Sequence, residues 1–118
     1  MTVLPDYQAS PTLRREPLTL STEWLNTTVV RISVAGEVDA SNTSELRQYI
    51  FHRAANCRNL ILDLQNVTFF ATAAFTALRT VDVRCGRASV SWMLVPSHAV
   101  TRVLEICDPN RTLPYGTA

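Results

Sequence analysis

The fold of this chain is decided by the run Leu60-Ile61-Leu62-Asp63-Leu64 and by the segment Thr68-Phe69-Phe70-Ala71-Thr72-Ala73-Ala74-Phe75 that follows it. A compact apolar run of strand length is typical of a central parallel strand that helices cover. The segment after it opens a helix, which we expect from about Thr72 to Arg84, with Gly86 as the glycine that ends it. Its apolar stripe consists of Ala74, Ala77, Leu78, Val81 and Cys85. We expect Asp63 to hydrogen-bond a nearby loop, because an unpaired buried carboxylate is costly.

Upstream of this strand, two runs of alternating apolar and polar residues surround a polar turn at Asn26-Thr27. This pattern predicts an antiparallel hairpin with one buried face. The apolar side of the hairpin consists of Leu18, Leu20, Trp24, Val30, Ile32 and Val34. Asn42, with Glu45 three residues later, predicts a capping box and a helix that begins near Thr43. The apolar stripe of that helix consists of Leu46, Tyr49, Ile50 and Ala54.

Downstream of the central helix, the sequence predicts one more strand and one more helix. Val90, Trp92 and Leu94 alternate with other residues in the strand, and Ser97 is placed to cap the helix that follows. The stripe of that helix consists of Val100, Val103, Leu104 and Cys107. Asp108-Pro109-Asn110 ends it, and Leu113 is a candidate for a short final strand.

The predicted order is therefore β-β-α-β-α-β-α. This order indicates the α/β class: a small sandwich in which an N-terminal β-hairpin is followed by parallel β-α units. We expect one mixed sheet with helices packed mainly on one face. The domain is expected over residues 17–114, after an N-terminal arm of residues 1–16 and before a C-terminal tail of residues 115–118.

Composition restricts the function further. The chain has 118 residues, 47% of them hydrophobic and 18% charged, and a net charge of +1. One domain with a real core is expected, without the clustered basic excess that nucleic acid or an anionic membrane requires. No segment has the length of a membrane-spanning helix and no secretory signal is visible, so we expect a cytoplasmic protein without membrane insertion.

Four stretches in this order resemble a known family. Gly36-Glu37-Val38-Asp39 resembles a Gly-Glu-Leu-Asp turn, and Leu60–Leu64 with Val67–Phe70 resembles the approach to a phosphorylation loop. Ala71–Phe75 occupies the position of Asp-Ser-Ser-Gly-Leu, and Val100–Leu104 resembles a Val-x-Arg-x-Leu helix core. Together they resemble the STAS domain, and within it the anti-sigma-factor antagonists. The resemblance covers about residues 18–114 and implies the STAS-like (SpoIIAA-like) fold.

The phosphorylation loop itself departs from the family pattern. The equivalent residues are Ala71, Thr72, Ala73 and Ala74. Ala73 stands where switched members carry serine, and alanine has no hydroxyl to phosphorylate. Thr72 is the one hydroxyl left, and two interpretations of it compete. It is either a surviving phosphoacceptor at a helix N-terminus or an N-cap whose oxygen accepts a backbone N–H, and the second is the more common role.

The resemblance implies a binding module rather than an enzyme. Such a protein docks on an anti-sigma factor of the histidine-kinase-like ATPase type, a protein kinase, and thereby regulates sigma-factor-dependent transcription. The expected partner-binding residues are Glu37, Asp39, Thr72 and Phe75. The alternative is an accessory STAS subunit of a larger complex, such as a bacterial lipid-transport ABC system. A nucleotide-binding STAS domain is a third and weaker hypothesis, and a homodimer stays open.

The remaining reactive residues give weaker signals. Cys57, Cys85 and Cys107 each fall near the end of a predicted helix. A redox-controlled pair among them is a hypothesis, although buried thiols are the simpler interpretation. His52 and His98 are isolated and read as surface residues. No catalytic motif, metal-ligand spacing or phosphate-binding glycine loop is present, so we expect no cofactor.

Overall fold

A computed structural model describes residues 16–117 of the chain. The predicted N-terminal arm therefore lies outside the described residues, except for its last residue. The elements in chain order are β1 (Thr19–Trp24), β2 (Val29–Val38), α1 (Thr43–Arg53), β3 (Asn59–Phe70), a short 3-10 helix (Thr72–Ala74), α2 (Phe75–Arg87), β4 (Ser91–Pro96) and α3 (His98–Cys107).

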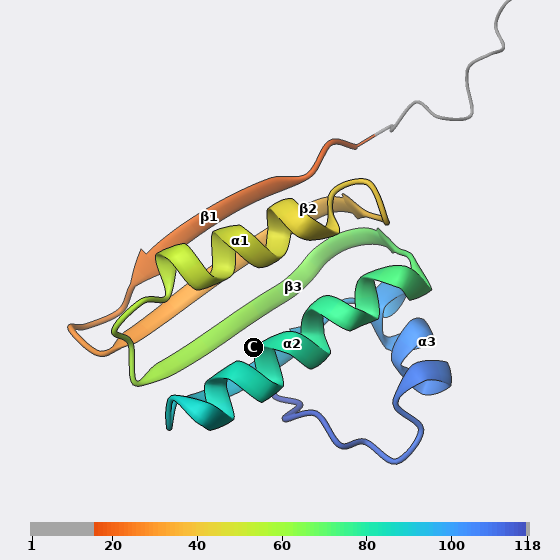
Figure 1. Ribbon diagram of the computed structural model, residues 1–118. Coiled ribbons are helices and arrows are strands. Elements are labelled where there is room, and N and C mark those ends of the chain that lie inside the picture. Colours follow the sequence, from red (N-terminus) through yellow and green to blue (C-terminus); the bar gives the residue numbers. More distant parts are fainter. Residues whose placement is uncertain (1–15, 118) are drawn as a thin grey trace, which may run out of the picture.

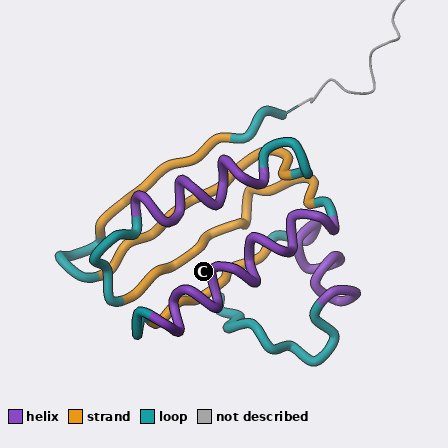
Figure 2. The backbone as a smooth tube through the Cα atoms, in the orientation of Figure 1, coloured by secondary structure: helices purple, strands orange, loops and turns teal. Residues whose placement is uncertain are grey.

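The four strands form one mixed sheet in the order β1-β2-β3-β4. β1 is antiparallel to β2, whereas β2, β3 and β4 are parallel. Helices α1 and α2 lie side by side over one face of the sheet, and α3 packs near the end of β3 (Figures 1 and 2). The predicted α/β order, hairpin and mixed sheet are confirmed, with helices mainly on one face.

The core lies between the sheet and these helices. Buried and half-buried residues alternate along β2, as the sequence predicted, and the buried ones include Val30, Ile32 and Val34. Val100 and Leu104 of α3 belong to the same apolar cluster. Trp24 is an exception on the predicted apolar side, since 43% of it is exposed. It lies at the end of the edge strand β1, where one side of the chain has no neighbouring strand.

Strand β3 is longer than the sequence pattern indicated. The pairing with β2 skips one residue of β3 after Asp63 and another after Val67. Each extra residue is a bulge that shifts the alternation of inward and outward side chains. The buried residues in this part of β3 are therefore three positions apart rather than two, at Leu64, Val67 and Phe70. The sequence pattern did not predict the second half of the strand, because this part lacks the usual alternation.

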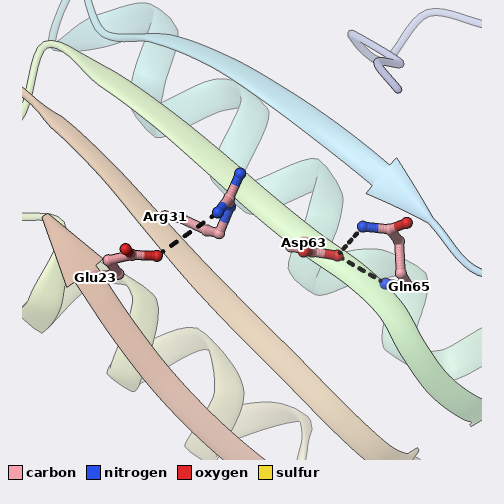
Figure 3. Close-up of polar contacts among 4 residues, drawn as sticks. All are labelled: Glu23, Arg31, Asp63 and Gln65. Carbon is pink, nitrogen blue, oxygen red and sulfur yellow. Dashed lines mark hydrogen bonds and ion pairs between the residues drawn. The ribbon is translucent and has the colours of Figure 1, made fainter. Parts of the chain in front are cut away.

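Asp63 lies within this strand and not at its end. Its carboxylate accepts hydrogen bonds from the backbone N–H and the side-chain amide of Gln65, each at 3.0 Å (Figure 3). The expected bond to a neighbouring loop is therefore wrong, because a residue two positions along the same strand satisfies the carboxylate. In the same view, Arg31 of β2 forms an ion pair with Glu23 of β1.

The end of α2 also differs from the prediction. Gly86 lies inside the helix, which continues to Arg87. Ser89 takes the left-handed conformation instead, with φ of 58°, and its N–H donates to the carbonyl of Gly86. Val90 N–H donates to the carbonyl of Cys85. These two bonds form a Schellman ending with serine in place of the usual glycine.

The chain after α3 is held by one buried carboxylate. Asp108 is 3% exposed and accepts hydrogen bonds from Thr112, Leu113 and Tyr115. Burial alone would raise the pKa of Asp108, but these bonds outweigh it and hold the pKa well below its usual range. Burial and the bond to Asp108 raise the pKa of Tyr115 to about 12. Tyr115 in turn forms a parallel bridge with Leu94 at the edge of β4.

Candidate functional site

The first part of the site is the junction between β2 and α1, at the carboxyl end of β2. Gly36 has φ of 94°, a conformation that side chains rarely adopt. A Cβ at this position would lie 2.1 Å from the carbonyl oxygen of Pro17. The next residue, Glu37, donates its N–H to the carbonyl of Glu16. The glycine of the Gly36–Asp39 turn is therefore required by both backbone angle and close approach.

Asn42 holds the rest of this junction together. Its side-chain oxygen accepts from the Asp39 N–H, and its amide donates to the Glu37 carbonyl, both at 2.9 Å. Thr43 donates its hydroxyl to the Asp39 carbonyl at 2.6 Å. The helix begins at Thr43 as predicted, but the capping box is wrong. The Asn42 side chain makes no cap bond to α1, because its oxygen and its amide bond residues before the helix.

The second part is the junction between β3 and α2, which lies beside the first. Ala71 donates its N–H to the carbonyl of Val38 at 2.9 Å, so the two strand ends are joined. Ala71 has an extended backbone and occupies the N-cap position of the 3-10 helix. Neither this helix nor α2 has a side-chain cap. The expected capping role of Thr72 is therefore wrong, because Thr72 comes one residue too late and is already helical.

Thr72 is exposed at this junction, as is Ala73. Within residues 16–117, its hydroxyl takes no hydrogen bond that would fix it to the fold. Thr76, one turn further along the chain, donates its hydroxyl to the Ala73 carbonyl at 3.0 Å. The one hydroxyl of the loop is therefore free to meet a partner, while Ala74 is buried in the core.

The two phenylalanines before the loop have opposite roles. Phe70 is 3% exposed and packs in the core, whereas Phe69 is 50% exposed. The pairing of β2 with β3 sets Phe69 opposite Glu37. Phe69 was missing from the expected partner-binding residues, because the second bulge of β3 decides which of the two points outward.

The expected partner-binding residues thus gather around the carboxyl ends of β2 and β3. We call Glu37, Asp39, Phe69 and Thr72 the rim. Phe75, the fourth expected residue, is half-buried at the start of α2, and the Arg79 guanidinium lies 5.0 Å above its ring. The rim therefore combines two carboxylates, one exposed aromatic ring and one free hydroxyl on a single edge of the sheet.

Two of the three cysteines come together away from the rim. Cys57 and Cys85 line one cavity of about 240 Å³ near the ends of α1 and α2. Burial raises the pKa of both thiols, that of Cys85 to about 11. Cys107 ends α3 and does not line this cavity. The raised pKa disfavours the reactive thiolate form of Cys57 and Cys85. A redox role for Cys57, Cys85 or Cys107 stays an untested hypothesis.

No helix within residues 16–117 is both long and apolar enough to cross a membrane. No group of three or more histidine, cysteine or acidic side chains there could hold a metal ion.

The sheet order β1-β2-β3-β4 and its three helices define a small α/β domain with a mixed sheet. The model of the STAS domain family matches residues 25–114, so the chain belongs to the STAS domain family. Among curated proteins, it is 30% identical over 73 residues to Osmosensory protein A of Mycobacterium tuberculosis. This match covers 62% of the chain and 46% of that protein, so the chain spans less than half of the relative's length.

Solved structures show the same fold. The chain superposes on an anti-sigma factor antagonist from Mycobacterium paratuberculosis with a TM-score of 0.76 and 23% identity, covering 86% of this chain and 87% of the other. It also superposes on the unphosphorylated form of the anti-sigma factor antagonist SpoIIAA with a TM-score of 0.68 and 16% identity, covering 84% and 89%. At these identities the likeness establishes the fold and not the partner.

Proposed function

We propose that this protein binds an anti-sigma factor of the histidine-kinase-like ATPase type through the rim, and so regulates sigma-factor-dependent transcription in the cytoplasm. The observation that carries the proposal is the pairing of an exposed Phe69 with a free Thr72 hydroxyl on one edge of the sheet. A large exposed aromatic ring beside polar groups is typical of a protein interface. The protein acts by binding, and its structural neighbours are antagonists of anti-sigma factors.

The rim also supports a form of regulation. Ala73 has no acceptor, but Thr72 offers an exposed hydroxyl at the start of a helix. A partner kinase would transfer the γ-phosphoryl group of ATP to the Thr72 oxygen, releasing ADP and the hydroxyl proton. The product would place about two negative charges beside Glu37 and Asp39. Repulsion there would weaken a contact that the unmodified rim makes.

The first experiment tests the interface. The protein is titrated against a candidate anti-sigma kinase by calorimetry, with Phe69→Ala and Trp24→Ala as matched variants. Both rings are similarly exposed, 50% and 43%, but only Phe69 lies at the rim. We expect Phe69→Ala to weaken binding about tenfold or more, as for an interface anchor, and Trp24→Ala to leave it unchanged. Equal effects of the two variants would place the interface elsewhere.

The second experiment tests the acceptor. The protein is incubated with the kinase and ATP, and its intact mass is measured before and after. We expect one phosphoryl group on the unaltered protein and none on Thr72→Ala. Incorporation that survives this substitution would remove Thr72 from the mechanism, while leaving the binding result intact.

A further inference from the structure

The outer surface of α2 carries an arginine row whose charges form no ion pair within residues 16–117. Arg79, Val83 and Arg87 follow one another at intervals of four residues, so they form a single line along the helix. All three are exposed, and Val83 is 45% exposed. We propose that this row, together with Arg84 beside it, docks an acidic segment of the partner protein that the rim binds. The inference thus rests on the proposed function and adds the chemistry of the partner.

The charges of the row are not neutralised within the described part of the chain. None of its arginines takes part in an ion pair there, since the pair found is Arg31 with Glu23. The one carboxylate of α2, Asp82, is turned toward the sheet and accepts a hydrogen bond from Trp92 at 2.9 Å. The positive charges therefore face solvent without a counter-charge from their own helix.

Two of the arginines are held in place by aromatic rings. The Arg84 guanidinium lies 4.2 Å above the ring of Phe51 on α1, and that of Arg79 lies 5.0 Å above Phe75. Stacking of this kind restricts the side chain while leaving its N–H groups for other partners. Less conformational entropy is then lost when a carboxylate binds.

Helix stability alone does not explain the row. Arg84 and Arg87 lie in the last turn, where cations interact favourably with the helix dipole. Arg79 lies in the first half of the helix, where the dipole offers a cation no such benefit. Its contact within the helix is with the Phe75 ring, and at this position Arg79 completes the line with Val83 and Arg87, which has an apolar residue at its centre.

The shape and charge of the row fit a short acidic polypeptide. From Arg79 to Arg87 the line is about 12 Å long, at 1.5 Å per residue, which matches about two turns of a partner helix. Val83 would receive an apolar side chain between acidic ones. A long polyanion such as nucleic acid fits less well, because α2 begins at the rim, where Glu37 and Asp39 would repel it, and the whole chain carries only +1.

The test compares two double variants of equal charge change. Arg79→Glu with Arg87→Glu reverses the row, whereas Arg58→Glu with Arg102→Glu reverses two exposed arginines elsewhere. The probe is a fluorescent peptide of repeated glutamate-glutamate-leucine triplets, followed by anisotropy, with a DNA duplex as a second probe. We expect the first variant to weaken peptide binding about tenfold and the control to weaken it by less than about threefold. Thermal melts check that both variants fold.

Three results would overturn the inference: no peptide binding, equal weakening by the two variants, or tighter binding of the DNA duplex. The neutral pair Arg79→Gln and Arg87→Gln decides the matter if the reversed pair does not fold. The anti-sigma kinase separates this inference from the proposed function. Kinase binding that ignores the row but requires Phe69 would end the inference alone. Peptide binding that requires the row, without any kinase binding, would end the proposed function alone.

Discussion

The two strand–helix junctions at the rim lie side by side but are built in opposite ways. Between β2 and α1, nearly every polar group is bonded to the chain itself: Asn42 joins Glu37 to Asp39, and Thr43 bonds Asp39. Between β3 and α2, three of four loop residues are alanine, and the helices start without a side-chain cap. The backbone bond from Ala71 to Val38 holds the second junction against the first.

This difference distinguishes polar side chains that stabilise the fold from polar side chains that are available to a partner. A polar side chain that satisfies its own backbone contributes to stability and offers little to a partner. One that bonds nothing in the fold costs little to remove, and any role it has must lie outside the fold. The Asn42 and Thr43 side chains of the first junction are therefore expected to respond to mutation through stability, and Thr72 of the second through binding.

The largest effect is expected at Gly36. Alanine there would put a Cβ 2.1 Å from the Pro17 carbonyl oxygen at φ of 94°. We expect Gly36→Ala to lower the free energy of unfolding by at least about 2 kcal/mol, measured by urea denaturation. Gly86→Ala is the control: a Cβ there meets no atom within 4 Å, and the helical position favours alanine by about 0.5–1 kcal/mol. A lower free energy of unfolding in Gly36→Ala together with a higher one in Gly86→Ala would support the structural role of the first junction. Equal losses in the two variants would contradict it.

Asn42 comes next in size. Asn42→Ala removes two hydrogen bonds from a side chain that is 4% exposed. We expect a loss of about 1–2 kcal/mol in the free energy of unfolding, because the Glu37 carbonyl and the Asp39 N–H lose their partner. Asn66→Ala, at an exposed position of β3, is the matched control and should change stability by less than about 0.5 kcal/mol. If both asparagines behaved alike, the first junction would not be held by Asn42.

These examples also show how far the sequence could predict the structure. Helix starts near Thr43 and His98 were predictable, because Asn42 and Ser97 are local signals for the start of a helix. The hydrogen-bond partner of a polar side chain was not predictable, because it depends on which strands lie beside that side chain. Asn42 finds Glu37 before its helix, and the bulges of β3 depend on the course of β2. The free state of Thr72 could likewise not be read from its type, since threonine is common at helix caps.

A working cap is available for comparison at α3. The Ser97 hydroxyl oxygen accepts the Val100 N–H at 3.2 Å, as the sequence predicted. We expect Ser97→Ala to cost about 1 kcal/mol in the free energy of unfolding, the usual value for a lost N-cap. The same urea titration measures it. A change near zero would mean that the Ser97 bond contributes little to stability. The presence of a side-chain cap at α3 and its absence at α2 would then make no difference to stability.

The smallest effect on stability is expected at Thr72. Its hydroxyl bonds nothing within the described residues, and alanine is the better helix former, so Thr72→Ala should change the free energy of unfolding by less than about 0.5 kcal/mol and in either direction. A loss equal to that of Ser97→Ala would show that Thr72 is a cap after all. Unchanged stability makes the partner experiments interpretable, because any lost kinase binding or phosphate incorporation in Thr72→Ala then reports on the hydroxyl itself. No other residue of the loop Ala71–Ala74 carries a hydroxyl, so the proposed regulation at the second junction depends on Thr72 alone.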